Sequence, residues 1–89
     1  MKSYPTEAGR ININGHRMEW AMKRSKSESA FGIQGSRIFD LTLKKDGVIV
    51  GEYEHGWSKM ISKEDEESNL CIKHLLRTYG KNKVEKVKK

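Results

Sequence analysis

The chain is short of residues that cross-link a protein or anchor it in a membrane. Among its 89 residues there is one cysteine, Cys71, so an internal disulfide is excluded and stability must come from packing. No run approaches the roughly 20 apolar residues that cross a bilayer, and residues 1–5 lack the apolar block of a secretory signal. We therefore expect a cytoplasmic protein that makes no membrane contact.

Catalytic motifs are also missing, since the chain contains no GxGxxG, no Walker loop and no nucleophile elbow. Cys71 and His74 have a spacing that suits a nucleophile with its base, or two metal ligands. We favour a structural interpretation, in which Cys71 is a small apolar residue of a helix and His74 is one of the cations in its last turns. We predict no enzyme activity, no cofactor, no metal and no small-molecule substrate.

Four carboxylates are expected on the outer face of a sheet, where they would attract a cation or act as an acid pair. Nearby lysines and arginines favour a solvated surface of mixed charge instead. The carboxylates concerned are Glu19, Asp40, Glu52 and Glu54.

Positive charge is plentiful but unevenly distributed. The formal net charge is +6, and residues 81–89 contain five lysines and one glutamate. The remainder, residues 1–80, has 13 basic and 11 acidic residues, so the body is almost balanced. We interpret residues 81–89 as a basic disordered tail.

The dipeptide Asn14-Gly15, between two alternating segments, predicts a first β-hairpin with a two-residue turn. The turn sets a register in which Ile13 faces His16 and Ile11 faces Met18. Residues 1–9 show no periodicity and are interpreted as a flexible lead-in to a single domain over residues 10–80. Alternation places one apolar set on the same face: Ile11, Ile13, Met18, Trp20 and Met22.

A second hairpin is predicted over residues 38–54. Phe39, Leu41 and Leu43 alternate with polar residues, which indicates a half-buried strand over 38–44 with these three side chains in the core. A further strand is expected over 48–54.

The loop between these two strands decides their register. A two-residue loop would bring Glu52 and Glu54 onto the core face, and burying carboxylates without partners is costly. We therefore predict a three-residue loop at 45–47, which pairs Leu41 with Gly51 and leaves Asp40 opposite Glu52 on the outer face.

The segment 31–37 has glycines at positions 32 and 35, which favour a bulge, a bend or the close approach of another backbone. The sequence does not distinguish these three.

A helix is predicted over about residues 63–79, capped by Ser62 with Asp65 in a capping-box position and ended by Gly80. Its apolar stripe comprises Cys71, Ile72, Leu75, Leu76 and Tyr79. The predicted fold class is therefore α+β, with an antiparallel sheet of about four strands in two hairpins and one C-terminal helix packed on one face.

The order of several short motifs resembles an uncharacterised family of short proteins from Gram-positive bacteria, their phages and mobile elements. The motifs are Ile13-Asn14-Gly15, Phe31-Gly32-Ile33, Gly35, Arg37-Ile38, Leu41, Tyr53, Gly56-Trp57 and a helix ending in Tyr79. The resemblance spans roughly residues 11–79. It implies a provenance and no mechanism.

These observations predict a non-enzymatic binding module whose partner is nucleic acid or a host protein. Basic side chains would contact phosphates through a loop, a hairpin and the tail, and an exposed aromatic segment would instead suit a protein partner. The protein-binding candidates are Tyr53 and Trp57. The nucleic-acid candidates are Lys23, Arg24, Lys26, Arg37, Lys44, Lys45, Lys81, Lys83, Lys86, Lys88 and Lys89.

Overall fold

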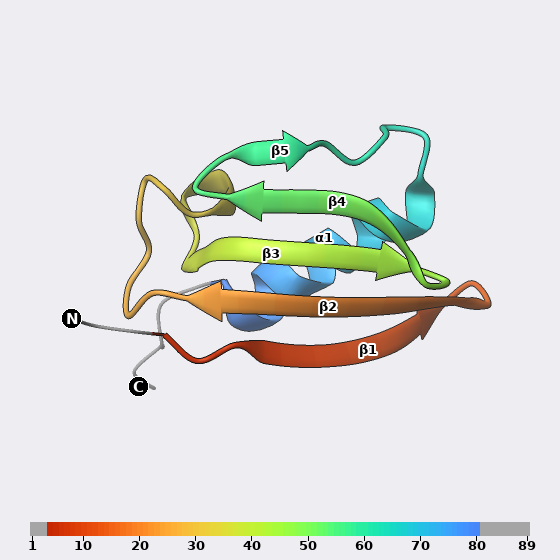
Figure 1. Cartoon of the computed structure of the whole chain (residues 1–89), viewed down its shortest axis with the longest axis horizontal. Coiled ribbons are helices and arrows are strands. Elements are labelled where there is room, and N and C mark those ends of the chain that lie inside the picture. The colour runs from red at the N-terminus through yellow and green to blue at the C-terminus, as the bar shows by residue number, and fades with distance from the viewer. Residues whose placement is uncertain (1–3, 81–89) are drawn as a thin grey trace, which may run out of the picture.

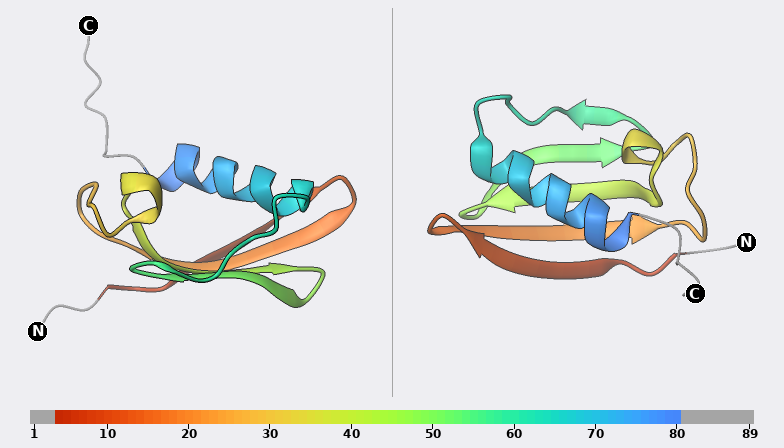
Figure 2. Two further views of the ribbon diagram at one scale, coloured as in Figure 1. Left: turned by 90° about the horizontal axis from the view of Figure 1, so that it is seen from above. Right: turned by 180° about the vertical axis from the view of Figure 1, so that it is seen from behind.

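A computed structural model describes residues 4–80 of the chain. Within them, five antiparallel strands follow one another in sequence order across a single sheet, β1-β2-β3-β4-β5, as Figure 1 shows. One helix, α1, covers one face of this sheet, and the other face stays uncovered (Figure 2). The α+β class with a C-terminal helix is thus confirmed, and the sheet has one strand more than predicted.

The first hairpin follows its turn chemistry. Asn14 and Gly15 both have positive φ, 52° and 83°, so they form the predicted two-residue turn between β1 (Glu7–Ile13) and β2 (His16–Arg24). Ile13 pairs with His16, as predicted. The strand begins at Glu7, inside the segment that we interpreted as a flexible lead-in, because residues 7–9 pair with the far end of β2.

The second hairpin corrects the prediction of a three-residue loop. Of the three residues 45–47, Asp46 and Gly47 have positive φ. They form a two-residue turn between β3 (Ile38–Lys45) and β4 (Val48–Glu54). A bulge then adds Val50 to β4, so that Leu41 pairs with Tyr53 rather than with a carboxylate. The bulge, rather than a longer loop, keeps the acidic residues out of the core.

The carboxylates of this hairpin therefore pair differently from the prediction. Asp40 faces Glu54, and Glu52 faces Thr42. The predicted pair of Asp40 with Glu52 is wrong, because the two-residue turn and the bulge together shift β4 by two residues relative to a three-residue loop.

A second bulge reverses the predicted orientation of Phe39. Lys23 pairs with Asp40 and Arg24 pairs with Ile38, which leaves Phe39 as the extra residue of β3. Ile38 is fully buried, whereas Phe39 is only partly buried. The interpretation of Phe39 as a core residue is wrong, because the bulge turns Ile38 inward in its place.

The glycine-containing segment 31–37 is not a strand. It contains a short 3-10 turn, η1 (Ile33–Gly35), and Gly32 is the point where two backbones touch. A Cβ atom on Gly32 would lie 1.7 Å from the carbonyl oxygen of Ser36. Of the three alternatives that the sequence left open, the close approach of another backbone is the one observed at Gly32.

The chain then forms the short edge strand β5 (Trp57–Lys59) and the helix α1 (Glu66–Tyr79). The helix begins later than predicted, because its N-cap is Asp65, whose carboxylate accepts a hydrogen bond from the Ser68 amide. Ser62 instead forms a turn before the helix, where its hydroxyl accepts from the Glu64 amide. Gly80 ends the helix, as predicted.

The core lies between α1 and the inner face of β2, β3 and β4. Cys71, Ile72 and Leu75 supply the helix side, so most of the predicted apolar stripe is confirmed. Ile11, Ile13, Val50, Trp57, Ile61, Leu76 and Tyr79 pack around its edge. The buried apolar residues are Met18, Trp20, Met22, Ile33, Ile38, Leu41, Leu43, Tyr53, Cys71, Ile72 and Leu75.

Candidate nucleic-acid interface

Arg24, one of the predicted phosphate contacts, is used inside the fold. Its Nε and Nη2 atoms each donate a hydrogen bond of 2.8 Å to the carboxylate of Glu7, and its guanidinium lies 5.2 Å from the centre of the Tyr79 ring. These contacts join both strands of the first hairpin to the end of α1. Arg24 is therefore not available to a phosphate without breaking a structural contact.

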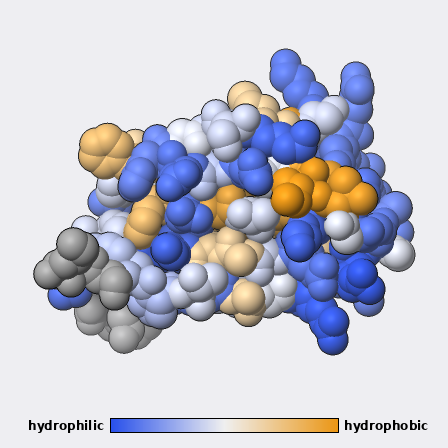
Figure 3. Space-filling model, viewed as in Figure 1, coloured by the Kyte–Doolittle hydropathy of each residue, from blue (hydrophilic) through white to orange (hydrophobic). Residues whose placement is uncertain are grey.

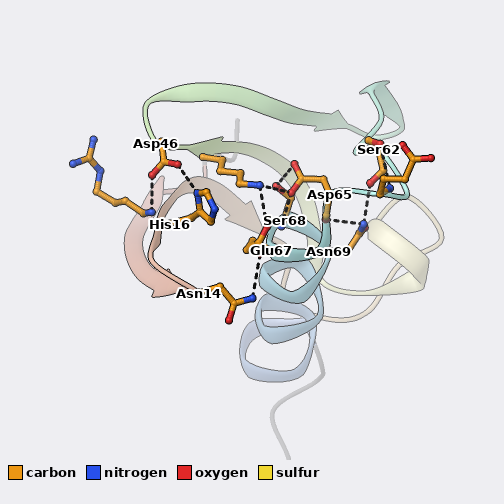
Figure 4. Close-up of polar contacts among 11 residues, drawn as sticks. Asn14, His16, Asp46, Ser62, Asp65, Glu67, Ser68 and Asn69 are labelled. Carbon is orange, nitrogen blue, oxygen red and sulfur yellow. Dashed lines mark hydrogen bonds and ion pairs between the residues drawn. The ribbon is translucent and has the colours of Figure 1, made fainter.

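Lys45 is likewise an internal anchor. Its Nζ atom lies 2.8 Å from Asp65 and 3.0 Å from Glu67, and its side chain is only 19% exposed. Glu67 also accepts a hydrogen bond from the side-chain amide of Asn14. Figure 4 shows these contacts at the start of α1. They attach the start of the helix to both hairpin turns. Lys45, predicted as a phosphate contact, therefore has both of these carboxylates as partners within the fold.

The ionisation of this group follows from its contacts. The hydrogen bond to Asp65, followed by the one to Glu67, raises the pKa of Lys45, and Lys45 lowers the pKa of Glu67. Burial alone would raise the pKa of Asp65, but the hydrogen bonds from Lys45 and Ser68 outweigh it and the pKa is lowered. All three groups are therefore charged at neutral pH.

A second polar contact joins the two hairpin turns directly. The Nδ1 atom of His16 lies 2.6 Å from one carboxylate oxygen of Asp46, and the Arg17 amide donates to the other oxygen (Figure 4). These bonds, the one from His16 first, lower the pKa of Asp46. We call the set Asn14, His16, Lys45, Asp46, Asp65 and Glu67 the polar network.

Three of the predicted cations in the folded body have no ion pair within residues 4–80: Lys23, Lys26 and Lys44. Lys23 lies at the end of β2, and Lys26 follows it in the long loop 25–37. Lys44 lies near the far end of the sheet, beside the β3–β4 turn. The structure therefore groups Lys23 with Lys26 and separates Lys44 from both.

Arg37 connects this loop to the end of the described chain. Its Nε atom donates to the Ser25 carbonyl oxygen, and its backbone amide donates to the Gly80 carbonyl oxygen at 2.7 Å. The chain therefore leaves the folded body beside the loop that carries Lys26. The five predicted lysines beyond Gly80 lie outside the described residues: Lys81, Lys83, Lys86, Lys88 and Lys89.

Four ring side chains gather at this same end of the sheet, and the sequence reasoning missed them as a group. Phe39 and His55 are stacked, with 5.4 Å between ring centres and 7° between planes. Phe31 and Tyr4 meet this pair edge-on, Phe31 against His55 at 6.0 Å and Tyr4 against Phe39 at 5.1 Å. We call Tyr4, Phe31, Phe39 and His55 the aromatic cluster.

The aromatic cluster is exposed and borders a shallow pocket. Phe31 is 65% exposed, and the pocket of about 180 Å³ is also lined by Ser25 and Ser29. The four rings come from four separate segments with no common spacing. The bulge beside Phe39 is the feature that could have revealed the group. The regular alternation of residues 38–44 hides this bulge in the sequence.

Tyr53 and Trp57, the predicted protein contacts, turn towards the core. Tyr53 is buried, and its hydroxyl donates to the carbonyl oxygen of Phe31 at 2.9 Å. Trp57 is partly buried and meets the Tyr53 ring edge-on at 5.1 Å. Tyr53 therefore supports the aromatic cluster from within, and Trp57 covers the edge of the core.

Cys71 lies in the core, whereas three of the four outer carboxylates lie on the opposite face of the sheet. Cys71 is fully buried, and burial raises its pKa to about 11, so its thiol stays protonated at neutral pH. Asp40, Glu52 and Glu54 border a pocket on the outer face. No group of three or more potential ligands suited to a metal ion occurs within residues 4–80.

Comparison with known proteins gives one match. The family described as a domain of unknown function (DUF7678) matches residues 6–80, nearly the whole folded body. No curated protein and no solved structure matches the chain significantly. Among the helical residues of the described chain, none form a segment long and apolar enough to span a bilayer.

Proposed function

The chain belongs to DUF7678, a family of unknown function, and from that premise we propose that this member is a non-enzymatic module that binds nucleic-acid phosphates. The supporting observation is that Lys23 and Lys26, which have no ion pair within residues 4–80, lie at the end where the chain continues into five lysines. Such cations displace condensed counterions from a phosphate backbone. The proposal includes an origin in a phage or mobile element of Gram-positive bacteria and a cytoplasmic location.

Some of the predicted cations are already engaged in contacts within the fold, so fewer of them are proposed here as phosphate contacts. Arg24 and Lys45 are engaged in the fold, and Lys44 lies beside the β3–β4 turn, at the opposite end of β3 from the loop 25–37. We propose that Lys23, Lys26 and the lysines of residues 81–89 supply the phosphate contacts. Binding through these groups would be electrostatic and largely independent of sequence.

Titration against labelled duplex DNA and RNA at about 50 mM and about 200 mM salt tests the proposal. Affinity should fall steeply with salt. On duplex DNA, a Lys23→Gln/Lys26→Gln double variant should reduce the slope of log affinity against log salt by about 0.9 for each phosphate that the protein no longer neutralises. Lys44→Gln is the matched control and should leave the slope unchanged. Absence of binding at low salt, or binding indifferent to salt, would remove the proposal.

A second candidate, a modulator that binds a host protein, is favoured by one observation. Val48 and Ile49 are exposed beside each other at the β3–β4 turn, Val48 to 64%, and Figure 3 shows a strongly hydrophobic patch at that end of the outer face. Such patches often mark protein contacts. Pull-down from a host lysate should lose its specific partner in a Val48→Ser/Ile49→Ser variant, with Lys44→Gln as control. An unchanged set of partners would remove this candidate.

A further inference from the structure

We propose that the aromatic cluster is a stacking site for an unpaired base, so that this module prefers single-stranded to duplex nucleic acid. The inference rests on the proposed function, because phosphate contacts hold the strand near the rings. Proteins that bind single strands combine a cationic track with aromatic side chains on which bases stack. Here the exposed rings lie at the same end of the sheet as Lys23 and Lys26, which have no ion pair within residues 4–80.

Two irregularities of the backbone place the central pair of rings. A bulge in β3 turns Phe39 to the outer side, and His55 has a positive φ of 59° in the turn between β4 and β5. Non-glycine residues rarely adopt such a φ, and bulges often redirect a side chain beside a functional site. The positions of Phe39 and His55 therefore depend on two unusual backbone conformations. Such conformations are concentrated at functional sites.

Hydrogen bonds fix the backbone that carries three of these rings before any ligand arrives. The His55 amide donates to the Phe39 carbonyl oxygen at 2.9 Å, which joins the two stacked residues. The Tyr53 hydroxyl holds the Phe31 carbonyl oxygen, and the Phe31 amide donates to the Ser29 hydroxyl. A preformed site loses little conformational entropy on binding.

The size and lining of the pocket favour a single base over a larger ligand. Its volume of about 180 Å³ is below the roughly 300–1,000 Å³ of pockets for drug-sized molecules. Every nucleobase offers a flat π-face, and the lining of the pocket combines four rings with two serines, Ser25 and Ser29. The site therefore suits one base of a strand without selecting its identity.

Charge sets the expected direction of the strand. Asp40 and Glu54 face each other on the sheet side of the rings, and Lys23 is the strand partner of Asp40. The phosphates should therefore run between Lys23 and the loop rather than over Glu54. Lys26 lies on the loop side, next to Ser25 at the rim of the pocket. We therefore place the backbone of the strand along the loop 25–37 and its base on the rings.

Fluorescence anisotropy with the full chain gives the test. The probes are a labelled oligothymidylate of about 15 nucleotides and a duplex of equal length. Phe31→Ala should weaken binding of the single strand about 5- to 150-fold, the effect of losing one stacked base. Its duplex affinity and its salt slope should stay unchanged, because the lysines remain.

Two variants control this result. Phe31→Tyr keeps the ring and should bind as the original protein does, whereas Ile49→Ala removes an exposed apolar side chain at the opposite end and should change nothing. Photocrosslinking of a strand that contains 5-iodouracil should label residues of the aromatic cluster.

The outcomes separate the two proposals. If the original protein binds the single strand and Phe31→Ala binds it equally well, the stacking site is overturned and the phosphate-binding function stands. Crosslinks confined to other parts of the chain lead to the same conclusion. If neither single strand nor duplex binds at low salt, the proposed function itself is overturned.

Discussion

The two ends of the sheet are held together by different means. At one end, the polar network joins both hairpin turns to the start of α1 through charged side chains, with Lys45 placed between Asp65 and Glu67. At the other end, Arg24 and Glu7 form one ion pair, and the loop 25–37 is held by backbone and side-chain hydrogen bonds, such as the Arg37 amide on the Gly80 carbonyl oxygen. The side chains of the first end are occupied by one another, whereas several rings of the second face solvent.

This difference indicates which end can take a ligand. A ligand at the polar network would have to displace ion pairs that fasten the helix to the sheet. A ligand at the aromatic cluster would meet exposed rings whose positions are set by backbone geometry. Mutations that separate the two ends therefore test the assignment, from the largest expected effect to the smallest.

Gly32→Ala should produce the largest loss of stability, because the backbone that supports the aromatic end leaves no room for a side chain. The new Cβ would lie 1.7 Å from the Ser36 carbonyl oxygen, and a backbone atom cannot move aside cheaply. We expect a loss of roughly 3 kcal/mol or more in the free energy of unfolding, measured by urea denaturation. Gly56→Ala is the control, since no atom lies within 4 Å of its Cβ. Equal stabilities would contradict the close approach.

The sequence predicted those parts of the fold that depend on local patterns. The Asn14-Gly15 turn determined its own register, and the apolar stripe identified the buried side of α1. The bulges in β3 and β4 were missed because an extra residue in a strand leaves no mark on composition. The bulge in β3 reversed the expected side of Phe39. The helix start was misplaced because Ser62 and Asp65 are both good caps, and tertiary contacts with Lys45 favour Asp65.

The candidate site was less predictable than the fold. Counting cations could not show that Arg24 and Lys45 are engaged within the protein, because their partners are distant in sequence. The aromatic cluster joins positions 4, 31, 39 and 55, which share no periodicity. Such a group arises only from the tertiary fold.

Acid should weaken the end of the sheet that holds the polar network before the end that holds the aromatic cluster. The pKa values of Asp46, Asp65 and Glu67 are lowered in the folded protein. Their contribution to stability is therefore complete above the unfolded-state pKa of about 4 and is lost as the pH falls further, through the lower folded-state values. Thermal unfolding should show a falling midpoint below about pH 4. Hydrogen exchange should show the Ser68 amide, bonded to Asp65, losing protection before the Gly32 amide, and the reverse order would contradict the comparison.

Lys45→Met should lower the thermal midpoint at neutral pH, because it leaves the Asp65 and Glu67 carboxylates without their cation. Methionine retains most of the apolar length of lysine, so the change reports mainly on charge. Lys44→Met is the matched control, since Lys44 is exposed and has no ion pair within residues 4–80. Equal midpoints for the two variants would mean that the polar network does not stabilise the fold.

Tyr53→Phe should cost about 1 kcal/mol, the usual value of one hydrogen bond, because it frees the Phe31 carbonyl oxygen. Urea denaturation should show a lower midpoint with an unchanged slope. Tyr4→Phe removes a hydroxyl that has no hydrogen-bond partner within residues 4–80, and it should be neutral. A neutral Tyr53→Phe would mean that the loop of the aromatic end is positioned without this bond.

Phe31→Ala should have the smallest effect on stability, within about 0.5 kcal/mol, because 65% of its surface already faces solvent. The measurement is again urea denaturation, with Ile49→Ala as an exposed apolar control from the opposite end. Such a result would mean that the ring adds little to the fold, although the Ser29 and Tyr53 hydroxyls hold the Phe31 backbone. A loss above about 1 kcal/mol would instead make Phe31 a structural residue, and its effect on binding would then report unfolding rather than stacking.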